Sequence, residues 1–287
     1  MNQMLDQALL SPRPGEVAPV CGAAASTQAV AERVTLLTGA SAGIGAELAR
    51  IFAADGHRLA LVARRGDRLN ALAEEITKAG GPKPLTIICD LGRSDACDLI
   101  ADTLAAEKVE VEYVVNNAGF GLMGEAVELD RAEQLGMVDL NVRAITDLTL
   151  RFADSVIRCK GGILNVASIA SYLPGPRMAV YYATKAYVLS FTEALHQELR
   201  SKGVRVTALC PGPVPTEFQL RAGVEPGFDS RLLNIPPYAV AMAGYRGLMA
   251  GRRVVLPGLA MRLIPLLLRL APRRLVLSAA HRVQTKR

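Results

Sequence analysis

From Arg33 onward, short apolar runs alternate with segments whose apolar residues recur at helical spacing, such as Ile44, Leu48 and Ile51. The runs do not alternate strictly between apolar and polar positions, which is typical of parallel strands that are covered on both faces of a sheet. Six runs are candidate strands: Val34–Leu37, Leu59–Ala63, Leu85–Cys89, Tyr113–Asn116, Ile163–Ala167 and Val204–Cys210.

Because strand and helix take turns, the pattern predicts parallel strands joined by right-handed crossovers. The expected fold class is α/β, a doubly wound parallel sheet of about seven strands in a single domain with a C-terminal helical extension. The seventh strand is expected at Arg253–Leu256, a short run between Gly251 and Pro257.

Composition divides the chain into three parts. Residues 1–30 contain three prolines and no apolar periodicity, so we expect a flexible N-terminal extension. Residues 31–258 carry the alternating pattern and are expected to form the one domain. Residues 259–287 are a basic, apolar C-terminal extension.

The five cysteines form no C-x-x-C pair and have no histidine cluster beside them, so neither a disulfide framework nor a metal site is expected. Reduced thiols and an N-terminus unlike a signal peptide favour a cytoplasmic protein. With 51% hydrophobic and 21% charged residues, the composition is that of a folded globular chain.

The net charge of +6 is concentrated in Ser230–Arg287, which has eleven Lys and Arg residues and no Asp or Glu. Nucleic acid is not expected as a partner, because the chain has no zinc-finger spacing and no helix-turn-helix beside this stretch. An anionic surface or an anionic ligand is the other possible partner of this basic stretch.

Within that stretch, Met261–Leu277 is expected to be amphipathic. Three arginines would lie within about 20° of one line on a helix: Arg262, Arg269 and Arg273. These arginines argue against a transmembrane span, and Pro265 and Pro272 favour two short helices or a kinked one. The apolar face is expected either to close over a pocket or pack in an oligomer interface, or to make peripheral contact with a membrane surface.

The first expected strand leads through a glycine-rich turn into a helical pattern, with Gly39, Gly43 and Gly45 spaced G-x-x-x-G-x-G around Ser41 and Ile44. Glycines at the start of a helix allow backbone amides to approach a pyrophosphate closely. The turn therefore predicts a dinucleotide site, the alternative being a tight turn without a ligand.

The second expected strand ends in Ala63, Arg64 and Arg65. A carboxylate at this position would bind the ribose hydroxyls of NAD, whereas cations suit the 2′-phosphate of NADP. We therefore expect NADP(H) to be preferred over NAD(H), with Arg64 as the main phosphate ligand and Arg65 assisting. Alternatively, both arginines belong to a solvated turn.

After the fifth expected strand come Ser168 and then Tyr181 and Lys185, which lie one helical turn apart on one face. A phenol with an ordinary pKa near 10 is a poor base at neutral pH, and a nearby ammonium is expected to lower that pKa. Tyr182 has no lysine four residues later, so we expect it to be a neighbour in the pocket or core.

These motifs occur together with Asn117, Ala118 and Gly119 after the fourth strand, and with Pro211, Gly212 and Thr216 after the sixth. In this order, over roughly Arg33 to Phe218, the chain resembles the short-chain dehydrogenase/reductase family, whose fold is Rossmann-like.

The resemblance implies an NADP-dependent oxidoreductase that transfers a hydride between the cofactor and a carbonyl or alcohol. Tyr181 would be the general acid or base, Ser168 would orient the substrate oxygen, Lys185 would bind the nicotinamide ribose and lower the tyrosine pKa, and Asn141 would hold a water. The remaining implied cofactor-binding residues are Asp90, Leu91, Asn117, Ala118, Gly119, Pro211, Gly212 and Thr216. Family members commonly pair through the helices that contain Asn141 and Tyr181, so a homodimer or homotetramer is expected.

The loop after the Pro-Gly motif, residues 213–237, is expected to be the substrate lid. It contains Val214, Phe218 and Leu220, while Phe120 and Met178 flank the expected mouth. This composition favours an apolar ketone, acyl compound or alcohol over a small polar acid. The alternative from another functional class is an NADP-sensing or scaffold protein that keeps the nucleotide fold without the chemistry.

Overall fold

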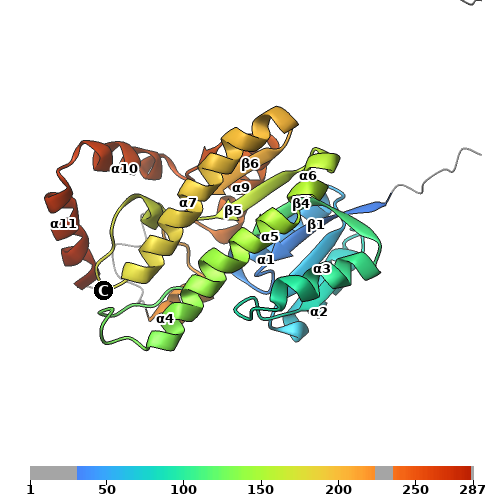
Figure 1. The fold of residues 1–287 in the computed structure, drawn as a ribbon, viewed down its shortest axis with the longest axis horizontal. Helices are drawn as coiled ribbons and strands as arrows, with labels where there is room; N and C mark the ends of the chain where they lie inside the picture. The colour runs from blue at the N-terminus through green and yellow to red at the C-terminus, as the bar shows by residue number, and fades with distance from the viewer. Residues whose placement is uncertain (1–30, 224–234, 286–287) are drawn as a thin grey trace, which may run out of the picture. The chain divides into compact units, whose positions relative to one another are not determined.

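The computed structural model describes residues 31–223 and 235–285 (Figure 1). Seven parallel strands form one sheet in the order β3-β2-β1-β4-β5-β6-β7. Their bounds are β1 Glu32–Thr38, β2 Leu59–Ala63, β3 Leu85–Ile88, β4 Val109–Asn116, β5 Gly162–Val166, β6 Arg205–Leu209 and β7 Val254–Val255. The α/β class and the doubly wound parallel sheet are therefore confirmed. β4 begins four residues before the expected Tyr113, because Val109–Glu112 alternate in polarity and give no apolar run.

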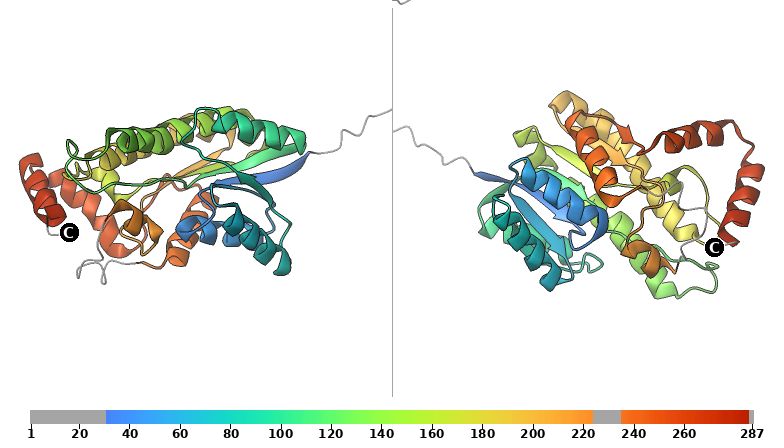
Figure 2. Two further views of the ribbon diagram at one scale, coloured as in Figure 1. Left: turned by 90° about the horizontal axis from the view of Figure 1, so that it is seen from below. Right: turned by 180° about the vertical axis from the view of Figure 1, so that it is seen from behind.

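Helices cover both faces of the sheet (Figure 2). On one face lie α1 (Gly43–Ala54), α2 (Gly66–Lys78) and α9 (Pro237–Met249), with Phe52 in the core beneath them. The other face is covered by four helices: α3 (Ala96–Ala106), α5 (Ile145–Arg151), α6 (Ala153–Cys159) and α7 (Ala179–Leu199). β2 is buried at all five residues, which explains its unbroken apolar sequence, and β1 is buried from Val34 onward.

The chain runs from β1 outward to β3 and then returns to place β4 on the other side of β1. The connections leaving β1 and β4 therefore diverge at their carboxyl ends. Open α/β sheets bind ligands in the crevice that forms at such a switch point.

Shorter elements border this crevice. They are α4 (Arg131–Val138), the π-helical turn η1 (Asp139–Ala144), the 3₁₀ turn η2 (Ile169–Tyr172) and α8 (Glu217–Ala222). A second 3₁₀ turn, η3 (Arg200–Lys202), follows α7 and lies outside the crevice. α8 lies inside the expected lid. Most of the remaining lid, residues 224–234, and the expected N-terminal extension, residues 1–30, lie outside the described residues.

The C-terminal extension forms two helices, α10 (Leu259–Leu270) and α11 (Arg273–Thr285), drawn in red in Figure 1. Pro265 is accommodated within α10, and the helix ends at Leu270, two residues before Pro272. The prediction that Arg262, Arg269 and Arg273 lie along one line of a helix was wrong for Arg273, because this residue begins α11 and does not continue α10.

Within residues 31–223 and 235–285, none of the helices combines the length and hydrophobicity that crossing a bilayer requires.

Candidate active site

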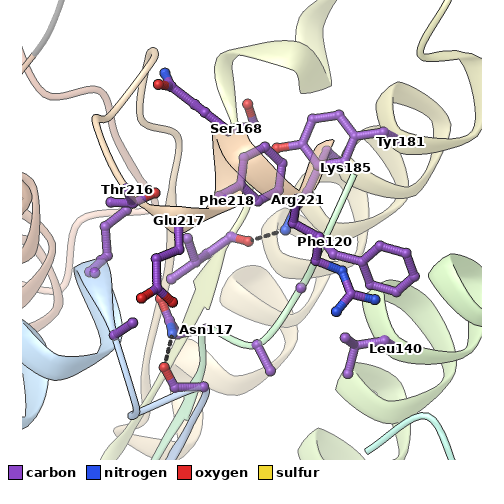
Figure 3. Close-up of a pocket in the computed structure, with 18 of the residues that line it drawn as sticks. Asn117, Phe120, Leu140, Ser168, Tyr181, Lys185, Thr216, Glu217, Phe218 and Arg221 are labelled. Atoms are coloured by element: carbon purple, nitrogen blue, oxygen red, sulfur yellow. Dashed lines mark hydrogen bonds between the residues drawn. The ribbon is translucent and has the colours of Figure 1, made fainter. Parts of the chain in front are cut away.

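A cavity of about 890 Å³ occupies the crevice at the carboxyl ends of the strands (Figure 3). The loops after β1, β2, β3, β4, β5 and β6 all contribute to its wall, as do α7 and α8. One cavity thus contains both the expected cofactor residues and the expected chemical residues.

The glycine-rich turn packs directly against the end of β4. Gly39 has a φ of +67°, and a Cβ there would lie 2.7 Å from Nδ2 of Asn117. A Cβ on Gly45 would lie 2.2 Å from the carbonyl oxygen of Gly39, so the first turn of α1 can approach the loop only with glycine at this position. Asn117 fastens the turn by donating from Nδ2 to the carbonyl oxygens of Thr38 and Gly39, at 3.0 and 3.2 Å.

This arrangement fits a dinucleotide. The turn and the N-terminus of α1 face the cavity through Gly39, Ser41, Gly43 and Ile44, which all line it. A helix N-terminus approached through glycines presents backbone amides to a phosphate.

Cationic side chains gather where β2 ends. Arg64 and Arg65 line the cavity, and Arg65 donates from Nε and Nη2 to Oγ of Ser41, at 3.2 and 2.9 Å. Nη1 of Arg64 lies 3.9 Å from Oδ2 of Asp90. Two guanidinium groups and a hydroxyl beside the glycine turn are suited to an additional phosphate on the ribose.

Tyr181 and Lys185 project from α7 toward Ser168, which follows β5 (Figure 3). All three line the cavity, and both α7 side chains are buried. Nζ of Lys185 donates to the carbonyl oxygen of Val166 at 2.8 Å and lies 6.0 Å from the centre of the Tyr181 ring. Oγ of Ser168 accepts a hydrogen bond from the amide of Ala170 at 3.1 Å, which fixes the hydroxyl at the cavity wall.

The expected lowering of the Tyr181 pKa is not found. Burial raises the pKa of Tyr181 to about 12, and a hydrogen bond with the Ser168 hydroxyl offsets only part of this rise. Nζ of Lys185 binds the carbonyl oxygen of Val166 and lies 6.0 Å from the centre of the Tyr181 ring, and desolvation of the buried phenol is the largest influence on its pKa. Tyr181 is therefore protonated at neutral pH in this structure.

Burial also lowers the pKa of Lys185 from 10.5 to about 8. Below pH 8 the folded protein holds a buried ammonium, whose cost is about 3 kcal/mol for a shift of this size. Between pH 8 and 10.5 the folded state binds fewer protons at this site than the unfolded chain does, so this group's destabilisation fades as pH rises.

We therefore expect Lys185→Met to gain stability relative to the wild type at pH 7, and to lose this advantage as pH rises to 10.5. Urea unfolding of the two proteins at pH 7, 9 and 10 measures the difference, in which the contributions of all other titrating groups cancel. If the difference in unfolding free energy between the two proteins did not change with pH, the lowered pKa of Lys185 would be contradicted.

Asn141 lies in the π-helical turn η1, an irregularity that often marks a functional position in a helix. Its side chain is fully buried: Nδ2 donates to the carbonyl oxygen of Phe120 and to Oγ1 of Thr184, at 2.9 and 3.1 Å, and Oδ1 accepts from the Phe120 amide. The side chain thus ties the loop after β4 to α7. A Cβ on Gly119 would lie 2.9 Å from Oδ1 of Asn141 and 3.4 Å from Nζ of Lys185, so this loop approaches both closely.

The structure brings nearly all of the expected site residues to one cavity. Asn141 and Gly45 are not in its wall, since they support the wall from behind. The lining residues are Gly39, Ser41, Gly43, Ile44, Arg64, Arg65, Asp90, Leu91, Asn117, Ala118, Gly119, Ser168, Tyr181, Lys185, Pro211, Gly212 and Thr216.

The substrate side of the cavity is largely apolar. Phe120, Met178 and Phe218 line it, and the ring centres of Phe218 and Tyr181 are 5.3 Å apart. The guanidinium of Arg221 lies 4.2 Å from the centre of the Phe120 ring and also lines the cavity.

Sequence reasoning missed two contributions to the site. Gln284 of α11 reaches the cavity wall and donates to the hydroxyl of Tyr182 at 2.7 Å, a contact across 102 positions that no local pattern indicates. Glu217 of α8 binds Arg65, and only its place directly after Thr216 could have suggested that it faces the cofactor side.

Comparison with known proteins agrees with this geometry. The family model for short chain dehydrogenase matches residues 33–224. The sulfoacetaldehyde reductase of Chromohalobacter salexigens is 39% identical over 188 residues, covering 64% of this chain and 73% of that protein. The chain belongs to the short-chain dehydrogenase/reductase family of oxidoreductases.

Solved structures of the family are similar throughout the domain. The short-chain dehydrogenase from Sphingobium yanoikuyae in complex with NADPH is 31% identical, with a TM-score of 0.72 over 82% of this chain and 92% of that one. The bulky-bulky ketone specific alcohol dehydrogenase from Comamonas testosteroni is 29% identical, with a TM-score of 0.68 over 79% of this chain and 86% of that one.

Proposed function

We propose that this protein transfers a hydride between NADP(H) and a carbonyl or alcohol group of an apolar substrate, with Tyr181 as the general acid or base. The observation that carries the proposal is the convergence of Tyr181, Ser168 and Lys185 on one cavity wall beside the glycine cradle. A nucleotide sensor would need the cradle but not this trio.

The cofactor, when bound, supplies or accepts the hydride at its nicotinamide ring. The Ser168 hydroxyl orients a carbonyl oxygen toward Tyr181, and the Tyr181 hydroxyl donates the proton that this oxygen gains on reduction. Burial keeps the phenol protonated, so Tyr181 can serve as the acid when a carbonyl is reduced. The backbone carbonyl of Val166 holds the Lys185 ammonium beside them.

A preference for NADP(H) is supported by the cations at the end of β2. Arg64 and Arg65 lie beside the glycine turn, where Arg65 binds Ser41, and the carboxylate nearest to Arg64, that of Asp90, belongs to the next strand connection. The similar structure from Sphingobium yanoikuyae contains NADPH. An NAD-type site would require a carboxylate where Arg64 stands.

The apolar wall formed by Phe120, Met178 and Phe218 supports a hydrophobic ketone or the matching alcohol as substrate. One observation favours a second candidate, a small anionic aldehyde: the Arg221 guanidinium lines the same cavity, and a relative is named sulfoacetaldehyde reductase. The Arg221 guanidinium already packs over the Phe120 ring, and three apolar side chains line this side of the cavity, so we place the apolar substrate first.

A carbonyl panel with NADPH and with NADH tests these proposals together. Bulky aliphatic and cyclic ketones are expected to be reduced faster than short anionic aldehydes, with NADPH favoured. Fastest turnover of the anionic aldehydes would move the assignment to the second candidate, and no turnover of any carbonyl or alcohol would favour the sensor function.

We also propose a homo-oligomer that forms through α5 and α7. Leu150 on α5 and Tyr187 on α7 are exposed apolar side chains on these helices, and Tyr187 stacks on Phe191 while its hydroxyl contacts Thr146 at 2.9 Å. Exposed apolar side chains held in place by such contacts suit a symmetric contact between identical helices.

The outer face of α10 supports peripheral contact with an anionic membrane. Its inner face carries the buried Met261, which packs under Gly212, whereas four leucines at helical spacing are 58–84% exposed: Leu263, Leu266, Leu267 and Leu270. Arg262 and Arg269 lie along one edge of this apolar stripe. Leucines flanked by cations match an interface rich in anionic lipid, and the same charges would repel a second copy of the face.

We expect the full chain to co-sediment with phosphatidylglycerol-containing vesicles at low salt, but not with vesicles of phosphatidylcholine alone. Leu266→Ser combined with Leu267→Ser and Leu270→Ser should abolish sedimentation, whereas Val127→Ser, at another exposed apolar position, should not. If the full chain remains in the supernatant with anionic vesicles, or if the triple variant sediments equally, the membrane contact is disproved.

A further inference from the structure

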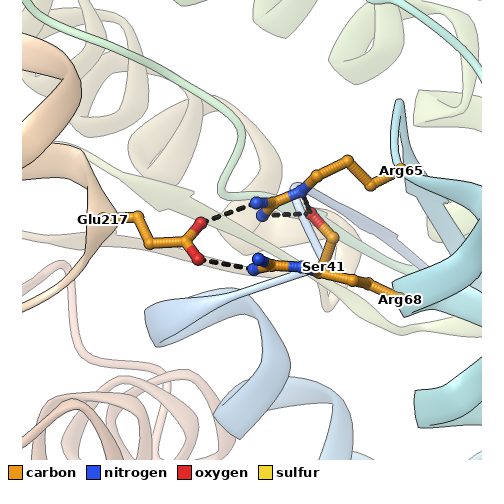
Figure 4. A network of polar contacts seen from close by, with 4 residues as sticks. All are labelled: Ser41, Arg65, Arg68 and Glu217. Atoms are coloured by element: carbon orange, nitrogen blue, oxygen red, sulfur yellow. Dashed lines mark hydrogen bonds and ion pairs between the residues drawn. The ribbon is translucent and has the colours of Figure 1, made fainter.

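The carboxylate of Glu217, in the expected substrate lid, binds the guanidinium groups of Arg65, an expected phosphate ligand, and of Arg68, which was not expected at the site (Figure 4). Oε2 of Glu217 accepts from Nη1 of Arg65 at 2.7 Å, and Oε1 accepts from Nη1 of Arg68. Arg65 simultaneously contacts Oγ of Ser41 in the glycine turn. The group that Arg65 and Arg68 bind in this structure is therefore an anion, placed beside the glycine cradle.

The packing of α8 presents Glu217 to these arginines. Glu217 is the first residue of the helix, and the next residue, Phe218, packs against the ring of Tyr181. Further along the helix, Arg221 lies over Phe120, and the carbonyl oxygen of Ala222 accepts from the amide of Met123 at 2.8 Å. These contacts hold α8 in place independently of the ion pairs.

The ion pairs themselves can be exchanged for another anion. The side chains of Arg65, Arg68 and Glu217 are 40–47% exposed, and ion pairs at this exposure contribute little to stability. Hydrogen bonds from Arg68 and then Arg65 hold the pKa of Glu217 below its usual range, so the carboxylate is ionised at neutral pH. A phosphate dianion is a stronger partner for a pair of guanidinium groups than a carboxylate is.

We infer that Glu217 and the 2′-phosphate of NADP(H) compete for Arg65 and Arg68. Glu217 thereby lowers the affinity for NADP(H) and leaves that for NAD(H) unchanged, and Arg68 is a third phosphate ligand beside Arg64 and Arg65. This inference rests on the proposed NADP(H) preference. It makes a residue of the substrate lid a determinant of cofactor selectivity.

Calorimetric titration with adenosine 2′,5′-bisphosphate and with ADP isolates this effect, because the first probe carries the 2′-phosphate and neither requires turnover. Glu217→Gln should bind the 2′,5′-bisphosphate roughly three- to tenfold more tightly than the wild type, as expected for loss of two exposed ion pairs. Its affinity for ADP should be unchanged. Glu74→Gln, which removes an equal charge from the exposed face of α2, is the matched control and should behave as the wild type.

Arg68→Gln should weaken binding of the 2′,5′-bisphosphate and spare that of ADP. Unchanged or weaker binding of the bisphosphate by Glu217→Gln would overturn the competition, and unchanged binding by Arg68→Gln would remove Arg68 from the phosphate site. A wild type that binds both probes equally would instead contradict the proposed NADP(H) preference, so the two failures can be told apart.

Discussion

Replacing Tyr181 with phenylalanine is expected to lower kcat by roughly 10²- to 10⁴-fold, the usual contribution of general acid–base catalysis. The ring still packs against Phe218 in this variant, so the fold and the cofactor affinity should be preserved. Stopped-flow reduction of a ketone substrate, together with NADPH titration, measures both quantities.

Tyr182→Phe is the matched control. The ring centre of Tyr182 is only 6.0 Å from that of Tyr181, but the Tyr182 hydroxyl accepts a hydrogen bond from Gln284. The control is expected to retain turnover within a few-fold of the wild type on this account. Retained turnover in Tyr181→Phe, or an equal loss in both variants, would show that the Tyr181 hydroxyl is not the proton donor.

Arg64→Asp is expected to lower the ratio of kcat/KM for NADPH to kcat/KM for NADH by roughly 10- to 100-fold. The substitution removes a cation from the 2′-phosphate and adds a carboxylate that repels it. The same carboxylate can accept the ribose hydroxyls of NADH. Arg64 is more than half exposed and its nearest charge, Asp90, is 3.9 Å away, so the change should not disturb folding.

Arg200→Asp provides the control, because it reverses the same charge in the exposed turn η3, outside the cavity wall. Its cofactor ratio should equal that of the wild type. If Arg64→Asp leaves the ratio unaltered, the 2′-phosphate does not bind at the end of β2.

The sheet could be predicted from the sequence because each strand is encoded locally. β2, for example, is five consecutive apolar residues, all buried, between a turn and an arginine pair. The site residues at the strand ends followed from the same logic, since parallel strands bring their carboxyl ends to one edge. Ser168 lies at the end of β5, and the resemblance to the family implied that Tyr181 and Lys185 of α7 would join it.

Contacts between distant segments could not be predicted in this way. The pairing of Glu217 with Arg68 spans 149 positions, and nothing in either neighbourhood encodes it. The π-helical turn around Asn141 also could not be predicted, because a turn of only six residues is too short to show a periodicity of its own. The pKa of Tyr181 depends on burial and on where Lys185 points, neither of which spacing along a helix determines.

The most direct test of the central claim is isotope transfer. The purified protein is given NADPH carrying deuterium at C4 of the nicotinamide and a bulky ketone, and the product alcohol is examined by mass spectrometry and NMR. Deuterium is expected on the carbinol carbon with the wild type and should be nearly absent with Tyr181→Phe. Wild-type protein that binds NADPH but transfers no deuterium to any carbonyl in the panel would contradict the proposed hydride transfer.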